Sequence, residues 1–415
     1  MVFMTPNNIF ERSVLSNGIR VVTEHIPYLR SVSVGFWVMA GSRDEMLSEN
    51  GITHLIEHLV FKGTKKRLME DIARSLESVG GHLDAFTGKE VTCFNAHILD
   101  EHLELAVDVL SDLLLNPTFP ENEFEKEKEV IIKELHHTLE TPDELIFDYF
   151  LKDIYPSHPL GFQIAGTPES VQSIGPEQLR PFMEKHFTAD RIIVSAAGNV
   201  DHKQLLALLE KYVTNAPTRS KRTLFQPTWP ASSRNEYHSP GSQAHICLGA
   251  PGYKYADNRK FALLLLNTFL GSGMSSKLFQ VVREKYGLAY SIFTFPDFFL
   301  DAGLFGIYVA TIKEKTDLVL DILLAELKRL VDKPFKADEL ERLKSQLKGN
   351  LMLSLENATS RMGRLANMEI YLQDYFSLDE VLQSIEATTK DEIRNVAEEL
   401  FADEQFVYTI LTPTE

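Results

Sequence analysis

The chain has 415 residues, of which 44% are hydrophobic and 24% charged, and its formal net charge is −17. This length suggests roughly two domains of about 200 residues each, and the composition is that of a globular protein with enough apolar residues for two cores. The acidic charge argues against a nucleic-acid partner, whose phosphates would repel it. It suits a basic or unfolded peptide, or it serves solubility alone.

Cysteine usage and hydropathy indicate neither export nor membrane insertion. The two cysteines, Cys93 and Cys247, fall in different halves of the chain, so a disulfide framework is not expected and a reducing compartment fits best. The first eight residues lack the basic and apolar regions of a secretory signal, and the longest apolar runs are far too short for a membrane span. We therefore expect no membrane association and a cytoplasmic location. An organelle matrix enzyme whose presequence had been removed would look the same.

The first half of the chain alternates predicted strands with predicted helices. Apolar residues predict strands at Val21–Val22 and over 31–39. Ile72, Leu76 and Val79 recur with helical spacing before two glycines. A second helix is expected over 101–115, and a buried strand over 191–198.

The second half repeats this order of elements. A strand is predicted over 244–249 and a long helix over 260–270, after a segment with turn residues and no periodicity. The sequence thus predicts domains over 1–215 and 241–415, joined by a linker over 216–240. The expected fold class is α+β, with two similar α/β-sandwich units whose antiparallel or mixed sheets are covered by helices.

The string His54-Leu-Ile-Glu57-His58 is the strongest chemical signal. On a helix, His54 and His58 share one face and can both reach one zinc ion. Glu57 projects at a different angle, which suits proton transfer with water rather than metal binding. The corresponding helix of the second half has neither histidine nor glutamate, so the chemistry is expected in the first half.

A catalytic zinc needs a third protein ligand. The helical segment 123–135 supplies acidic candidates, because Glu127, Ile131 and Glu134 recur on one face. Spacing alone does not choose between Glu127, Glu129 and Glu134. A charged solvent-facing surface, paired with neighbouring lysines, would show the same pattern.

These features resemble the pitrilysin–insulinase family of zinc peptidases, in the branch of the mitochondrial processing peptidase. The order His-x-x-Glu-His is that of the inverzincins. The resemblance covers nearly the whole chain, and its matching stretches are 16–21, 41–45, 51–64, 80–94, 159–161, 270–273 and 283–290.

The resemblance implies roles for residues that spacing leaves open. The family's distal zinc ligand lies 76 positions after the second histidine, which is Glu134 here, and Glu127 is then the partner of a ligand histidine. The segment with Asp84 and Ala85 is similar to the strand that pairs with extended substrate. Because the family usually has asparagine at position 84, the resemblance implies the strand pairing rather than a side-chain contact.

The second domain is implied to bind substrate through an arginine and a tyrosine seven positions apart. Arg283 and Tyr290 fit this spacing, with Arg283 on the substrate backbone and Tyr290 on the developing oxyanion.

The expected function is that of a metalloendopeptidase with one Zn²⁺ per chain. It would cleave unfolded, possibly basic, presequence-like peptides inside a closed chamber formed by a homodimer, or by a heterodimer with a homologue that lacks the motif. The alternative is a non-catalytic core or partner subunit of the same fold, with a structural metal site; the complete motif argues against it.

Overall fold

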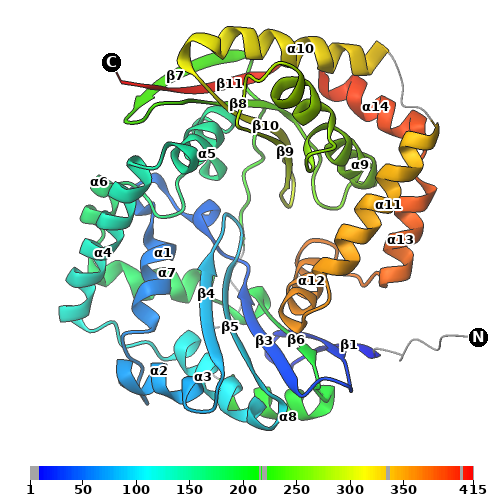
Figure 1. Ribbon diagram of the computed structural model, residues 1–415. Coiled ribbons are helices and arrows are strands. Elements are labelled where there is room, and N and C mark those ends of the chain that lie inside the picture. The colour runs from blue at the N-terminus through cyan, green and yellow to red at the C-terminus, as the bar shows by residue number, and fades with distance from the viewer. Residues whose placement is uncertain (1–8, 215, 217–221, 333–336, 402–404, 415) are drawn as a thin grey trace, which may run out of the picture. The chain divides into compact units, whose positions relative to one another are not determined.

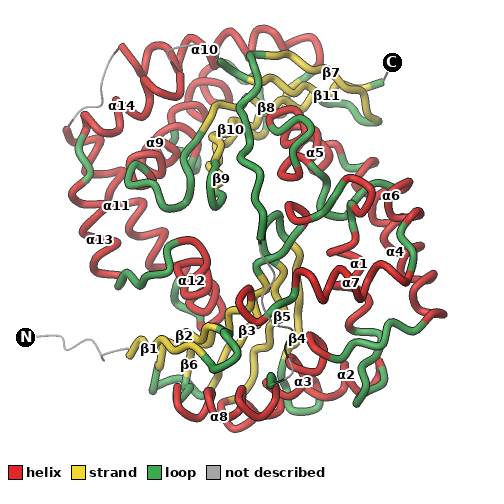
Figure 2. The backbone as a smooth tube through the Cα atoms, turned by 180° about the vertical axis from the view of Figure 1, so that it is seen from behind, coloured by secondary structure: helices red, strands yellow, loops and turns green. Residues whose placement is uncertain are grey.

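The computed structural model describes residues 9–214, 216, 222–332, 337–401 and 405–414. The chain forms two compact units, each built from three segments. The first unit comprises Met1–Leu135, Phe162–Leu224 and Ser354–Tyr375, and the second comprises His136–Gly161, Phe225–Leu353 and Phe376–Glu415. Figure 1 labels the helices and strands, and Figure 2 shows the same chain from behind.

A six-stranded mixed sheet forms the centre of the first unit. Its order is β1-β2-β6-β3-β5-β4, with β2 and β6 parallel and the other neighbours antiparallel. The strands are β1 (Ile9–Val14), β2 (Arg20–His25), β3 (Ser31–Val38), β4 (His82–Thr87), β5 (Thr92–Leu99) and β6 (Ile192–Gly198). The strands predicted at Val21–Val22, over 31–39 and over 191–198 are confirmed as β2, β3 and β6.

Helices cover both faces of this sheet. Val34 and Phe36 of β3 face the larger core, whereas Trp37 faces the smaller core beneath α12, which contributes Met362 and Leu365. Since both faces are buried, these strands read as continuous apolar runs. The helices of this unit are α1 (Ile52–Val60), α2 (Met69–Glu77), α3 (Leu103–Leu115), α4 (Glu121–Leu139, which extends into the second unit), α6 (Pro168–Ser173), α7 (Pro176–His186), α8 (His202–Tyr212) and α12 (Ala358–Tyr371).

The second unit has a five-stranded mixed sheet of order β7-β11-β8-β10-β9, in which only β7 and β11 run parallel. Its strands are β7 (Ser233–Ser239), β8 (Ala244–Pro251), β9 (Ser291–Phe298), β10 (Gly303–Thr311) and β11 (Val407–Pro413). Its helices are α5 (Pro142–Ile154), α9 (Lys260–Gly271), α10 (Thr316–Asp332), α11 (Ala337–Ser354), α13 (Leu378–Ala387), α14 (Lys390–Phe401) and the π-helix Phe279–Lys285.

The two sheets share one topology, which confirms the predicted duplication. In chain order, β2 to β6 of the first unit correspond to β7 to β11 of the second, and the spatial order β2-β6-β3-β5-β4 matches β7-β11-β8-β10-β9. The position of the parallel pair is the same in both sheets. The chain is therefore two similar α/β sandwiches.

Each half of the chain gives one helix to the sheet of the other half. In the first half α5 follows α4 and packs on β8 and β11 of the second unit. In the second half α12 follows α11 and packs on β2, β3 and β6 of the first unit. Ile146 and Phe150 of α5 lie fully buried against Cys247 of β8 and Val407 of β11.

Part of the predicted linker is a strand. The prediction of irregular structure is wrong for residues 233–239, which form β7. Its first six side chains alternate between half-buried and exposed, and six of its seven residues are polar or charged, so it carries no apolar period. Residues 215 and 217–221, at the predicted boundary, lie outside the described residues. The predicted domain limits stay a prediction. The compact units do not follow these limits along the chain, since α5 belongs to the second unit and α12 to the first.

None of the helices in the described part of the chain combines the length and apolar composition that a membrane crossing requires.

Candidate metal site

Helix α1 carries the predicted motif and is anchored by its apolar side. Leu55, Ile56 and Leu59 are fully buried in the core of the first unit, which leaves His54 and His58 on the less buried side. The helix begins after Gly51, whose φ of 96° lies in the left-handed region. A Cβ at this position would also stand 2.7 Å from the backbone oxygen of Ala165, so glycine suits this start.

The start of α1 is capped by a side chain from outside the helix. Glu45 is 3% exposed; its Oε2 accepts hydrogen bonds from Asn50 Nδ2 at 3.0 Å and Gly51 N at 2.9 Å, and its Oε1 accepts from Thr53 N at 2.9 Å. Burial raises the pKa of Glu45 to about 7, against the lowering effect of these bonds. A carboxylate here pairs helix N–H groups that have no intrahelical acceptor.

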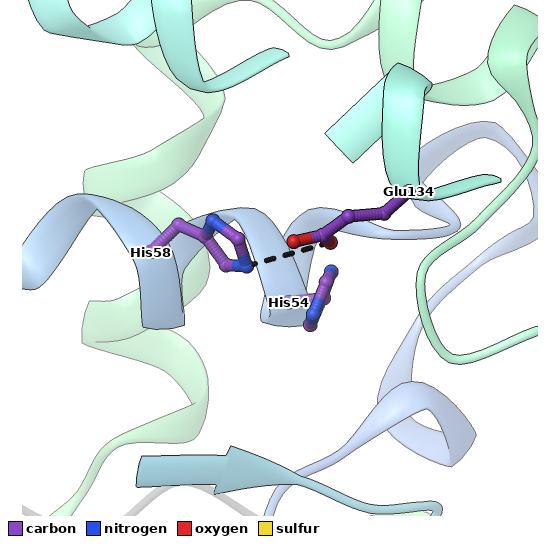
Figure 3. A group of neighbouring side chains, drawn as sticks. All are labelled: His54, His58 and Glu134. Atoms are coloured by element: carbon purple, nitrogen blue, oxygen red, sulfur yellow. Dashed lines mark ion pairs between the residues drawn. The ribbon is translucent and has the colours of Figure 1, made fainter. Parts of the chain in front are cut away.

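Helix α4 brings the predicted acidic residues to the histidines. One ligand-type atom from each of His54, His58 and Glu134 forms a group within 4.8 Å (Figure 3). His58 Nε2 lies 3.8 Å from Glu134 Oε2, while His58 Nδ1 lies 3.0 Å from Glu127 Oε2. Ile131, between the two glutamates on α4, is fully buried and fixes this face toward the core.

The donor set fits a divalent cation. A carboxylate only accepts hydrogen bonds, so His58 donates Nδ1–H to Glu127 and, when neutral, turns the lone pair of Nε2 toward Glu134. Two lone pairs facing each other repel unless a cation lies between them. Ligand atoms of one tetrahedral zinc stand about 3.4 Å apart, so small side-chain rotations would close the group around an ion.

His54 is held neutral, as a metal ligand must be. Its pKa is lowered to about 4, chiefly by burial and in smaller part by the neighbouring His58. The His54 and His58 rings stand edge to face with centroids 4.6 Å apart. Among the described residues, His54 Nδ1 is buried without a hydrogen-bond partner. The lowered pKa and the unpartnered nitrogen agree with a neutral imidazole that can bind a cation.

Glu57 stands beside the group without belonging to it. Its Oε2 accepts a hydrogen bond from the hydroxyl of Thr87 on β4. Burial raises the pKa of Glu57, the Thr87 hydrogen bond and His58 oppose this rise, and the charges of Asp84 and Glu134 add to it. The carboxylate is thus oriented by a hydrogen bond from a neighbouring strand.

The predicted substrate strand is the outermost strand of its sheet. Asp84 is exposed and Ala85 half-buried on β4, which pairs only with β5 in the first sheet. The backbone oxygen of Asp84 accepts a long hydrogen bond of 3.4 Å from Asn95 Nδ2. Helix α1 packs against β4, so this strand edge and the histidine group belong to one local arrangement.

Arg283 and Tyr290 belong to the second unit. Arg283 Nη1 donates to the backbone oxygen of Tyr290 at 2.8 Å, and its guanidinium lies 5.0 Å from the centroid of the Tyr290 ring. The Tyr290 side chain is 74% exposed. The two residues are therefore neighbours, and their predicted role toward substrate stays a prediction.

Three residues around the site were not predicted. Lys62 lies four positions after His58, a helical spacing that could have drawn attention to it. Its Nζ lies 2.8 Å from Glu127 Oε1. Glu45 and Thr87 had no such signal, because each reaches α1 from a separate segment.

Comparison with protein families divides the chain into two matches. Residues 20–168 match the family described as insulinase, peptidase family M16, and residues 173–347 match the M16 inactive domain. A protein of Bacillus subtilis named as an uncharacterized zinc protease is 36% identical over 98% of this chain and 99% of its own length. A Streptomyces coelicolor protein of the same description is 38% identical over 94% of this chain and 86% of its own.

Solved structures with the same fold are more distant in sequence. A Pseudomonas fluorescens structure described as an M16 inactive domain superposes with a TM-score of 0.91 at 20% identity, over 98% of each chain. A Helicobacter pylori protease gives a TM-score of 0.90 at 21% identity, over 98% of this chain and all of its own. At these identities the likeness shows the fold alone.

Proposed function

Because this chain belongs to the insulinase family of M16 peptidases, we propose that it is a zinc-dependent endopeptidase with its metal held by His54, His58 and Glu134. The main support for this proposal is that one ligand atom from each of two imidazoles on α1 and one carboxylate on α4 lie within 4.8 Å of one another. The names of the bacterial relatives support zinc as the metal. The half-exposed side chain of Glu134 supports a site that remains open to water and substrate.

A bound zinc would polarise the scissile carbonyl and make a water easier to deprotonate. Glu57 takes one proton from that water as the water oxygen bonds to the carbonyl carbon. When the carbon–nitrogen bond then breaks, Glu57 returns the proton to the leaving amine. Thr87 holds the Glu57 carboxylate through both transfers, and Glu127 keeps Nε2 of His58 available by accepting Nδ1–H.

The proposed substrate is an unfolded peptide that adds a strand to β4 at Asp84 and Ala85. Support comes from the position of β4 at the sheet edge and from its packing against α1. Backbone pairing of this kind reads little sequence, so a range of extended peptides would be accepted. The net charge of −17 favours basic ones.

The family also suggests roles for Arg283 and Tyr290 and a closed chamber. We propose that Arg283 and Tyr290 bind substrate, which the exposure of the Tyr290 side chain allows. A second copy of this chain, or a homologue without the motif, would complete a closed chamber around the peptide. Both cysteines are free and buried, which suits the cytoplasm or another reducing compartment.

A non-catalytic role is the alternative. The match of residues 173–347 to an inactive domain fits the second half, where the helix after β8 has neither histidine nor glutamate. The first half brings His54, His58 and Glu134 together, with Glu57 nearby. A purely structural metal site would have no use for the Glu57 carboxylate. This arrangement favours catalysis.

The test is Glu57→Gln, which keeps the size of the side chain and its acceptor for Thr87. We expect one zinc per chain to be retained and peptide cleavage to fall by about 100- to 10,000-fold, because no base remains. Metal analysis and cleavage of an unstructured basic peptide measure the two effects. Unchanged cleavage would contradict the mechanism.

Matched variants on α4 test the ligand set. Glu134→Gln should lose both zinc and cleavage, whereas Glu129→Gln, at an exposed position of the same helix, should lose neither. Full zinc content in the Glu134→Gln protein would remove Glu134 from the site.

A further inference from the structure

Lys62 holds the carboxylate that contacts His58. It comes immediately after Phe61, the residue that caps the end of α1, and its backbone N–H donates to the Leu59 oxygen at 3.1 Å. Its Nζ lies 2.8 Å from Glu127 Oε1, while Glu127 Oε2 faces His58 Nδ1 at 3.0 Å. The Glu127 side chain is 8% exposed and that of Lys62 is 22% exposed. One nearly buried carboxylate is thus held between an ammonium and an imidazole.

This arrangement orients Glu127. A carboxylate that accepts from a fixed ammonium on one oxygen presents the other oxygen in a defined direction. Without the ammonium, Glu127 would be a nearly buried anion beside the His58 imidazole, and such a charge turns toward water where it can. His58 would then lose the acceptor that keeps its proton on Nδ1.

We propose that Lys62 is a positioning residue of the metal site, acting through Glu127 to keep Nε2 of His58 free for the metal. Its relevance to zinc rests on the proposed function, whereas its effect on the His58 tautomer does not. Outer partners of metal-binding histidines change metal affinity by about 10- to 100-fold. Lys62 is one contact further away, so we expect an effect near the lower end.

The experiment uses the full chain with Lys62→Met, which keeps the apolar stem and removes the charge. Zinc affinity is measured by competition with a chromophoric chelator. We expect the dissociation constant for zinc to rise about tenfold in Lys62→Met and to stay within about twofold of the wild-type value in Lys62→Arg. Lys62→Gln is the substitute if the methionine variant does not fold. The matched control is Lys66→Met, which removes an exposed lysine paired with Asp108 at 2.9 Å.

A second measurement tests the route through Glu127. In metal-free protein labelled with ¹⁵N-histidine, His58 should carry its proton on Nδ1 in the wild type and shift toward the other tautomer in Lys62→Met. In a Glu127→Gln background, Lys62→Met should weaken zinc binding no further.

The outcomes separate the two proposals. Unchanged affinity in Lys62→Met, a tautomer that does not shift, or an added loss in the Glu127→Gln background would each overturn the role of Lys62. A wild-type chain that binds no zinc would contradict the proposed function, and the tautomer would then decide the role of Lys62 by itself.

Discussion

His186 is a buried histidine outside the metal site whose charge state is set by its neighbour. Arg191 Nη1 lies 3.1 Å from His186 Nδ1, and because a guanidinium only donates, the imidazole accepts and is neutral. Burial lowers its pKa to about 4; Asp44 opposes this effect, while Arg191, Lys185 and Arg222 reinforce it. The folded chain therefore disfavours a proton that the unfolded chain binds below about pH 6.5.

This neutral histidine predicts a loss of stability in acid. A lowered histidine pKa gives stability that is present above pH 6.5 and lost as the pH falls to about 4. We expect His186→Gln to reduce the slope of unfolding free energy against pH in this window by up to about 1.4 kcal/mol per pH unit. Urea unfolding at a series of pH values measures it, with exposed His136→Gln as the control. An unchanged slope would contradict a neutral His186.

For single residues, the sequence predicted the site residues that share one helix. It missed those that contact α1 from other segments of the chain. His54 and His58 follow from helical periodicity, and residue spacing kept Glu127, Glu129 and Glu134 as candidates. The family resemblance chose Glu134, which the structure places at the histidines. Thr87 has no local signal, because its contact with Glu57 depends on the packing of β4 against α1.

Among the elements, α1 depends on a cap that its own residues do not supply. Gly51 has no side chain to cap the helix, and both oxygens of Glu45 accept hydrogen bonds at its start. In Glu45→Gln one oxygen becomes an amide that cannot accept, which leaves a buried N–H without a partner. Such a loss lowers the free energy of unfolding by about 1–3 kcal/mol.

We expect this loss in urea unfolding at pH 8, above the Glu45 pKa of about 7. Zinc binding should weaken with it, because the start of α1 carries His54. Glu49→Gln, on the same loop, should stay within about 0.5 kcal/mol of the wild type. A wild-type stability in Glu45→Gln would show that α1 does not need the cap.

Elements with an apolar period were predictable and those without one were not. Strands β2, β3 and β6 and helices α3, α4 and α9 lie where their buried residues indicate. Strand β7 was missed because its partner β11 supplies the apolar residues of the pair, and its own side chains are largely polar. Its identity depends on a pairing with residues 174 positions later in the chain, as for Ser233 and Val407.

For the whole molecule, metal binding should appear as added stability. A ligand that binds only the folded state at 100 times its dissociation constant adds about 2.7 kcal/mol. We expect zinc to raise the Tm of the chain and a chelator to reverse the rise. Differential scanning calorimetry measures this, and Glu134→Gln should abolish the shift. A zinc-induced rise that persists in that variant would place the ion elsewhere.

The overall duplication was predictable, since both halves repeat one order of strands and helices. The exchange of α5 and α12 was not, because a helix carries its apolar face in its sequence but not the identity of the sheet that receives it.

That exchange has a consequence for how the protein can be divided. A single break between β6 and β7 would leave one fragment with α5, which the second sheet needs, and the other with α12, which the first sheet needs. Neither fragment would hold a complete sandwich, and each would carry a helix that only the other can bury. The gene is therefore expected to tolerate fission only if both products are made together and reassemble, as in a split-protein complementation pair.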